Sequence, residues 1–267
     1  MRLLCLNVAL FETNNEKLYE FLLKTKPDII CLQEVADKLD SEVNPLYISK
    51  GFIDKATVNL PYSLFSPNWE ICNFHRKNFH KKENFDFEFG GFLRAGNYFK
   101  SKFKILKRAN VFIKYKTIRF TDWSTWPAKQ PKAVQVVDLQ LPNFEKIRIL
   151  NYHGIWTKEK IGNPETLAAC KRINKLATEV SYPTIITGDF NLFPDTKSMK
   201  VFQNHFISLV DKYHIQATRP ESNELNHLQR NVVDFILVTP NIKIKSFKVL
   251  DSDVSDHLPL ILDFELT

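Results

Sequence analysis

A short segment near residue 189 carries the first side chains whose types and spacing can do chemistry. An apolar, β-branched run over 184–187 leads directly into Gly188, Asp189, Phe190 and Asn191. A carboxylate and an amide two residues apart point the same way if the chain stays extended. Together they can hold a cation, orient a water molecule or bind a phosphate oxygen. The alternative is purely structural, because Asp and Asn side chains also stabilise the turn that follows a strand.

Further polar positions share this setting, since each follows, interrupts or directly precedes an apolar run. They are Asn7, Glu34, His153, Asp234 and the pair Asp256 and His257. An acid inside an apolar strand is costly unless it is paired, and a carboxylate can orient and charge a histidine. Glu34 is a suitable ligand for a hard cation. Taken singly, Glu34 is also consistent with an exposed strand end, and His153 with a hydrogen-bonded residue at a sheet edge.

Two strand–helix–strand units position these residues. In the first, 3–8 and 29–32 predict strands around a helix at 15–25, and the second strand ends at Gln33 and Glu34. In the second, 146–152 predicts a strand ending in His153, Asn163 caps a helix, and the strand at 184–187 ends at Asp189, with Gly188 turning the backbone tightly. This repeat predicts two sheets packed face to face, with helices outside and polar strand ends converging on one rim.

The remaining chain predicts mostly strands. They are expected at 109–115, 133–141, 232–238, 246–250 and 259–266. Segments 133–141 and 146–152 form a hairpin across Pro142 and Asn143, Asp234 lies in the middle of its strand, and Asp195 caps a short helix containing Met199. No linker or low-complexity segment divides the sequence, so we expect residues 1–267 to form a single domain.

Composition adds a weaker indication of the partner. The 267 residues carry a formal net charge of +7, and the pI is about 9.1. This balance favours a polyanionic partner, although a lysine-rich soluble protein has the same property. Between Phe74 and Phe89, aromatic residues alternate with basic ones, a combination that can stack bases and pair with phosphates. The alternative is a surface excursion whose lysines are simply solvated.

The four cysteines have no CxxC spacing, so we expect reduced thiols, no zinc site and a cytoplasmic location. No apolar run approaches the roughly 20 residues of a membrane span. No secretory signal is recognised at the start of the sequence. We expect a monomer without a membrane span.

Six motifs, in this order, resemble the endonuclease/exonuclease/phosphatase superfamily over nearly the whole chain. They are Leu6-Asn7-Val8, Gln33-Glu34, Asn151-Tyr152-His153-Gly154, Gly188-Asp189-Phe190-Asn191, Val233-Asp234-Phe235-Ile236 and Ser255-Asp256-His257. The resemblance implies an α/β fold, a four-layer αββα sandwich of two mainly antiparallel sheets with outer helices, like deoxyribonuclease I. This agrees with the duplicated unit inferred from the strand pattern.

The same resemblance implies a cofactor, Mg²⁺ or Mn²⁺. Glu34 would be its principal ligand, Asn7 would support the metal or a phosphate oxygen, and Asp256 would hold the metal directly or through water. A metal ion can neutralise charge on a phosphate and lower the pKa of bound water.

The resemblance also implies the catalytic roles. Asp189 would position and deprotonate the attacking water, or serve the leaving group, and Asn191 would bind the phosphate. His257, oriented by Asp234, would contact the scissile phosphate. His153 would stabilise the phosphoryl oxygens or protonate the leaving oxygen.

Three features depart from the family pattern. Ala9 stands where some family nucleases have an acid that assists the metal. The catalytic tyrosine of the abasic-site endonuclease branch has no clear counterpart. Lys102 falls where the family often has arginine, which makes it a candidate phosphate contact.

These observations predict a metal-dependent nuclease that hydrolyses phosphodiester bonds in DNA or RNA. The alternative is a phosphatase or phosphodiesterase acting on a small molecule or a lipid headgroup, with Trp123, Trp126 and Trp156 walling a compact pocket. A third hypothesis is a non-catalytic binding module on a decayed hydrolase fold. The presence of every core residue argues against the third.

Overall fold

The structure is a computed structural model that describes residues 1–10, 14–72, 91–115, 130–220 and 231–266, with only the backbone for Ile71 and Cys72. Its elements, in chain order, are β1 (Arg2–Asn7), α1 (Asn15–Thr25), β2 (Ile29–Lys38), η1 (Pro45–Tyr47), α2 (Ser49–Ala56), β3 (Tyr62–Cys72), β4 (Phe92–Ser101), β5 (Lys104–Lys114), β6 (Lys132–Gln140), η3 (Pro142–Phe144), β7 (Lys146–His153), α3 (Pro164–Thr178), β8 (Thr184–Asp189), η4 (Met199–Phe202), β9 (Ile207–Ser208), α4 (Leu209–Lys212), β10 (Asp234–Val238), β11 (Ile242–Val249) and β12 (Leu260–Leu266). The predicted aromatic and basic contacts between Phe74 and Phe89, and the predicted pocket walls Trp123 and Trp126, lie outside the described residues.

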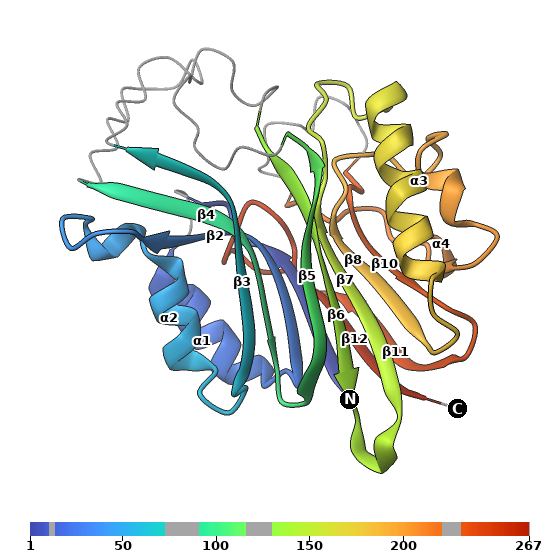
Figure 1. Ribbon diagram of the computed structural model, residues 1–267, viewed down its shortest axis with the longest axis horizontal. Helices are drawn as coiled ribbons and strands as arrows, with labels where there is room; N and C mark the ends of the chain where they lie inside the picture. The colour runs from blue at the N-terminus through green and yellow to red at the C-terminus, as the bar shows by residue number, and fades with distance from the viewer. Residues whose placement is uncertain (11–13, 73–90, 116–129, 221–230, 267) are drawn as a thin grey trace.

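Two six-stranded sheets pack face to face in the described part of the chain (Figure 1). Their strand orders are β11-β12-β1-β2-β4-β3 and β5-β6-β7-β8-β10-β9. Each sheet contains one parallel pair, β1 with β2 and β7 with β8, while the other neighbours are antiparallel. The predicted α/β sandwich of two mainly antiparallel sheets is confirmed.

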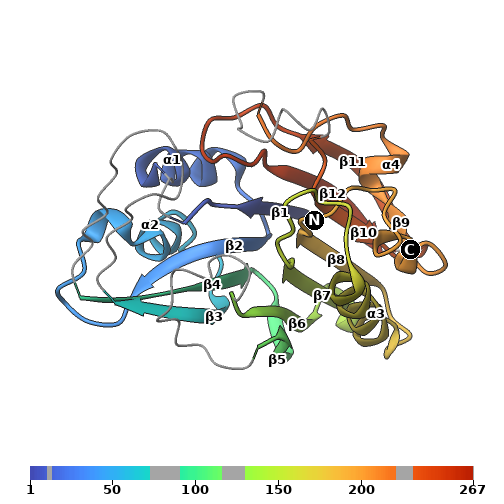
Figure 2. The same ribbon diagram turned by 90° about the horizontal axis from the view of Figure 1, so that it is seen from above.

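The helices cover the outer faces of this sandwich. Helices α1 and α2 lie against the first sheet, and α3 lies against the second, on the opposite side of the molecule (Figure 2). Helix α3 begins with a capping box. The Asn163 side chain accepts the Thr166 backbone N–H, and the Thr166 hydroxyl accepts the Asn163 backbone N–H. None of the helices in the described ranges is long and apolar enough to cross a membrane.

The two parallel pairs place the polar strand ends on one rim. Helix α1 connects β1 to β2, and α3 connects β7 to β8, so each pair is a β–α–β unit. Parallel strands finish at the same edge of a sheet, and the register pairs Asn7 with Gln33 and His153 with Asp189. The predicted internal repeat is therefore confirmed.

Strand alternation decides which polar residues face inward. Leu3 and Cys5 contribute to the core between the sheets, whereas Leu4 and Leu6 pack on the α1 side. Successive side chains of a strand point to opposite faces. Asn7 therefore continues the inward row begun by Leu3 and Cys5, and it is 1% exposed.

Glu34 does not end its strand, which corrects the prediction. Strand β2 continues to Lys38, and its register against β4 shifts between Leu32 and Val35. Gln33 and Glu34 lie at this bulge, and Glu34 has a left-handed φ of 58°. Bulges re-aim side chains and are common beside active sites. The bulge is thus the device that presents Glu34 at the rim.

Three local predictions near the second sheet are also wrong. Asp234 is the first residue of β10 and does not lie in its middle. Ser198, not Asp195, occupies the cap position of η4, and the Thr196 hydroxyl accepts the Met199 N–H there. Gly188 lies within β8, paired with Tyr152 and Phe235, so it does not turn the chain.

Gly188 is needed because β7 approaches it closely. Its φ is +139°, and a Cβ there would lie 1.8 Å from the Tyr152 carbonyl oxygen. Gly188→Ala should therefore lower the free energy of unfolding by more than about 3 kcal/mol, or prevent folding. Urea titration measures this loss. Gly51→Ala is the matched control, because this glycine of α2 has only Ile48 at 3.9 Å and should gain about 0.5–1 kcal/mol. Equal stability of the two variants would contradict the steric argument.

A buried ion pair joins the hairpin of β6 and β7 to α3. Arg148 donates to both carboxylate oxygens of Asp138, at 2.7 and 2.9 Å, and to the Leu176 carbonyl at 2.8 Å. Tyr182 donates to the same carboxylate. Burial alone would raise the pKa of Asp138, but the hydrogen bonds from Arg148 and Tyr182 hold it below its usual value.

Asp138→Asn should destabilise the protein by about 3–5 kcal/mol at pH 7, because it leaves the buried Arg148 charge unpaired. The stabilisation by ionised Asp138 is fully present above its unfolded pKa near 3.8 and is lost as the pH falls through the lower folded value. The difference between wild type and variant should therefore shrink in acid. Denaturant titrations from pH 7 to pH 3 measure it, with Asp253→Asn, an exposed ion-pair partner of Lys17, as the control. A difference that is constant with pH would contradict this account.

Candidate active site

Asn7 joins the carboxylates of the two sheets. Its amide nitrogen donates to Oε1 of Glu34 and to Oδ2 of Asp189, both at 3.1 Å. Its amide oxygen accepts the Ala9 N–H at 3.0 Å. One side chain at the end of β1 therefore holds the acid from the β2 bulge beside the acid from the end of β8.

Asp189 forms the turn and also belongs to the site, so the two interpretations of this motif are not exclusive. Its Oδ1 accepts the Asn191 backbone N–H at 2.8 Å, and its Oδ2 accepts the Asn191 side-chain amide at 3.0 Å. Asn191 has a left-handed φ of 55°, which asparagine tolerates better than most residues. Asp189 is 2% exposed and Asn191 3%.

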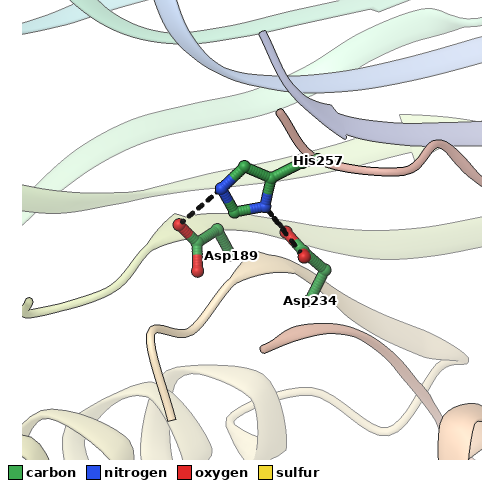
Figure 3. Close-up of side chains that lie close together, drawn as sticks. All are labelled: Asp189, Asp234 and His257. Atoms are coloured by element: carbon green, nitrogen blue, oxygen red, sulfur yellow. Dashed lines mark hydrogen bonds and ion pairs between the residues drawn. The ribbon is translucent and has the colours of Figure 1, made fainter. Parts of the chain in front are cut away.

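Asp234 and His257 form a hydrogen-bonded pair beside Asp189 (Figure 3). Nδ1 of His257 lies 3.0 and 2.9 Å from the two Asp234 oxygens, and Thr218 donates to the same carboxylate at 2.7 Å. Burial opposes the imidazolium, but the nearby carboxylates, Asp234 first and then Asp256, together outweigh it and raise the pKa of His257 to about 9. Nε2 then carries a hydrogen, and it lies 3.9 Å from Oδ2 of Asp189.

Asp189 is an anion in these surroundings. Burial would raise the pKa of its carboxyl, but the neighbouring His257 charge lowers it below the usual range. Glu34 differs, because burial dominates and raises the pKa of its carboxyl. The two acids that Asn7 bridges therefore have opposite tendencies to bind a proton.

His153 faces both acids but is held by a lysine. Its Nε2 lies 3.4 Å from Oε1 of Glu34, 3.8 Å from Oδ2 of Asp189 and 3.0 Å from Nζ of Lys132. Burial first, and the Lys132 charge second, hold the pKa of His153 well below its usual value. An ammonium can only donate, so the Nε2 of His153 is an acceptor in this arrangement.

A layer of buried amides lies between the apolar core and these charged groups. Gln33 donates to Asn151, Asn151 donates to Gln135, and Gln135 donates to Ser66. Asn97 donates to the Asn151 carbonyl. The bonds from Gln33 to Asn151, from Asn97 to Asn151 and from Gln135 to Ser66 cross between the sheets, so they fix the relative position of the strands that carry the site.

Two arrangements of acids can be considered for a metal. Asp189, Asp234 and His257 have ligand atoms within 4.8 Å of one another, the one such group in the described ranges. Hydrogen bonds within and around this group already occupy Asp234 and Nδ1 of His257. Glu34 and Asp256 could also hold a cation, because each presents a hard oxygen ligand and the Asp256 charge raises the pKa of Glu34 further, a repulsion that a cation would relieve.

The structure brings all the predicted site residues to one rim, with Asp256 at its exposed side. The Asp256 side chain is 42% exposed, and its Oδ1 lies 3.9 Å from Nε2 of His257. Lys102 is different, since it lies beside Asp28 at the opposite end of β2 and 63% of its side chain is exposed. Lys102 is therefore not part of the site, and its prediction as a phosphate contact is wrong.

Three buried cations at this rim were not predicted. Lys132, Lys160 and Arg219 are 2%, 0% and 5% exposed. Burial lowers the pKa of Lys132 to about 8 and that of Lys160 to about 7. In the sequence each lysine sits next to proline or among charged residues, where a solvated side chain is the usual expectation. Only the fold shows that they are inside.

The sequence matches the endonuclease/exonuclease/phosphatase family over residues 4–257, and the chain belongs to that family. Enzymes of this family hydrolyse phosphoester bonds, typically with a divalent metal. The human Nocturnin catalytic domain with bound sulfate is 18% identical, with a TM-score of 0.68 over 100% of this chain and 94% of that one. The mannosyl-6-phosphatase Bt3783 of Bacteroides thetaiotaomicron VPI-5482 is 14% identical, with a TM-score of 0.65 over 100% of both chains. At these identities the likeness shows the fold alone.

One curated relative also matches part of the sequence. It is a UPF0294 protein of Vibrio campbellii (strain ATCC BAA-1116), 26% identical over 150 residues. The match covers 55% of this chain and 49% of the relative, so it spans about half the length of that protein.

Asp234→Asn should lower the pKa of His257 from about 9, because burial then opposes the imidazolium without the charge and hydrogen bond of Asp234, and only Asp256 and Asp189 remain to favour it. The imidazole signal of His257, followed by NMR from pH 5 to 10 in metal-free protein with EDTA, measures the change. Asp211→Asn, an exposed change in α4, should leave the titration unchanged. A His257 that still titrates near 9 in the Asp234 variant would contradict the pairing.

Proposed function

We propose that this protein is a divalent-metal-dependent nuclease that hydrolyses phosphodiester bonds in DNA or RNA. We further propose that residues 1–267 form one catalytic domain. The observation that supports hydrolysis is the hydrogen-bonded array around Asn7, which joins Glu34, Asp189 and, through Asp189, Asn191. The array lies within 4 Å of both histidines of the site.

The metal site in this proposal consists of Glu34 and Asp256, with Mg²⁺ or Mn²⁺ as the ion. When bound, the ion neutralises phosphate charge and lowers the pKa of a coordinated water. Asn7 positions Glu34 with its amide nitrogen and leaves its oxygen on Ala9, so its main role is to orient the ligand. Ala9 offers no further acid at this point, which favours a site with one metal.

Asp189 accepts the proton of the attacking water. Its ionised state at neutral pH and its three donors, Asn7 and both nitrogens of Asn191, support this role because they fix the carboxylate in place. Asn191 has a second amide hydrogen for a phosphate oxygen. His257, charged and oriented by Asp234, donates its Nε2 hydrogen to the phosphate.

His153 has a narrower role than the resemblance implies. Its Nε2 accepts from Lys132, so this nitrogen cannot also donate to a phosphoryl oxygen in the arrangement observed. We propose that His153 orients the Lys132 ammonium beside Glu34. Protonation of the leaving oxygen then falls to His257 or to water.

The formal net charge of +7 supports a nucleic-acid substrate, because contacts to a phosphate backbone are electrostatic. A small phosphoester remains the competing substrate, and only an assay separates the two. The test is a panel of single- and double-stranded DNA and RNA, nucleotides, sugar phosphates and phospholipid headgroups, each with Mg²⁺, Mn²⁺ or EDTA.

We expect cleavage of nucleic acid with Mg²⁺ or Mn²⁺, loss of cleavage with EDTA, and recovery on adding the metal. Asp189→Asn should lower kcat by about 10²–10⁴, the usual contribution of a general base, without unfolding the protein. Asp211→Asn serves as the surface control. Cleavage confined to small phosphoesters would overturn the nuclease assignment, and full turnover by the Asp189 variant would overturn its role.

A further inference from the structure

Two buried lysines at the rim have no carboxylate of a described residue close enough to pair with them. No carboxylate oxygen of a described residue lies within 4.0 Å of Nζ of Lys132 or Lys160. Other buried cations of this protein are paired directly, since Lys100 lies 3.0 Å from Asp54 and Arg148 2.7 Å from Asp138. Burying an ammonium is costly unless an anion compensates it. Among the described residues, these two lysines therefore remain open to a further anion.

The Lys132 ammonium lies on the Glu34 side of the rim. It is the first residue of β6, and its Nζ lies 3.0 Å from Nε2 of His153. Among the described residues this is its one hydrogen bond, and none of them takes the other two ammonium hydrogens. His153 Nε2 is also 3.4 Å from Glu34, which places the Lys132 charge next to the proposed metal ligand.

The Lys160 ammonium lies on the Asp189 side of the rim. Its Nζ donates to Oδ1 of Asn191 at 2.5 Å, and the amide nitrogen of Asn191 donates to Asp189. The ammonium lies 4.7 Å from the centre of the Trp156 ring. The Lys160 carbonyl accepts the Phe193 N–H at 2.9 Å, which ties its loop to the segment after Asn191. This lysine is therefore held in place and still has hydrogens to donate.

The acids nearest the lysines are already engaged. Asp189 accepts three hydrogen bonds from Asn7 and Asn191, and Glu34 accepts one from Asn7. A third cation adds to the buried positive charge at this rim, because Nε of Arg219 is buried without a hydrogen-bond partner among the described residues. An anion entering between these groups would gain several charge-assisted hydrogen bonds at once.

We propose that Lys132 and Lys160 bind the phosphate group of the substrate, Lys132 beside Glu34 and Lys160 beside Asn191. The proposal rests on the phosphoester hydrolysis proposed above. It makes both lysines substrate-binding residues, whereas a structural role would confine them to neutralising Glu34 and Asp189. A phosphate group can come from a small ester or from a nucleic-acid backbone, and the two sources are separated by the ligands used in the test.

The test measures binding by isothermal titration calorimetry, with EDTA and with Mg²⁺. The ligands are inorganic phosphate and a short oligonucleotide that has internal phosphodiesters and no terminal phosphate. Lys132→Met and Lys160→Met should each weaken binding of at least one ligand about tenfold or more, the effect of losing a charge-assisted hydrogen bond. Lys132→Arg and Lys160→Arg should retain binding within about threefold, because the charge remains. The ligand that loses affinity identifies the source of the phosphate.

Lys100→Met is the matched control, because Lys100 is 6% exposed but pairs with Asp54 away from the rim. It should leave phosphate affinity unchanged even if it lowers stability. If a methionine variant does not fold, Lys132→Gln or Lys160→Gln replaces it, since glutamine keeps a donor but removes the charge.

Unchanged affinity for both ligands in the folded neutral variants, or no binding of either ligand by the wild type, would overturn the proposal. The binding result does not depend on whether the protein hydrolyses any substrate. Lost binding in the variants without hydrolysis of any substrate would overturn only the proposed function. Hydrolysis with unchanged binding and unchanged KM in the variants would overturn only the role of the lysines.

Discussion

Asn7 bonds two carboxylates that come from different sheets, and much of the rim depends on this contact. Its amide nitrogen donates to Glu34 and Asp189, which would otherwise be two partly or fully buried acids facing each other. Burying such charges is costly unless donors and opposite charges surround them. The surrounding donors and cations, which include Asn191, His257 and the buried lysines, are consequences of that cost. The same compensation holds Asp189 ionised, which a base for water requires.

The position of Asn7 is itself a result of pairing two β–α–β units. Each unit has a parallel pair, and parallel strands finish at the same edge. One unit supplies Asn7 and Glu34, the other His153 and Asp189. The amide layer formed by Gln33, Asn151 and Gln135 then connects the sheets directly beneath the acids. A polar layer of this kind tolerates few displacements, because each lost bond leaves a buried group unsatisfied. The geometry of the site is thereby coupled to the packing of the whole sandwich.

The described part of the protein contains two kinds of buried cation. Arg148 and Lys100 are paired with their own carboxylates and act as structural ties. Among the described residues, the ammonium of Lys132 hydrogen-bonds to a neutral imidazole, and that of Lys160 hydrogen-bonds to a neutral amide and lies over the Trp156 ring. This contrast within one protein is more informative than the net charge, which many soluble proteins share. It points to the rim as the place where an anion is received.

The sequence by itself determined the β–α–β repeat, several of the other strands and the identities of the polar residues at the rim, but it did not predict α2, β3 or β4. The predicted features follow from local rules, because alternation and apolar runs record which face of a strand is buried. Only the tertiary structure decided that Glu34 lies on a bulge, that Gly188 lies inside its strand, and that Lys102 is remote from the site. It also decided that Lys132 and Lys160 are buried, although each stands in a polar stretch of sequence. The physical reason is that register, close backbone approach and burial depend on neighbours far away along the chain, and a lysine has the same local pattern whether it faces water or a buried acid.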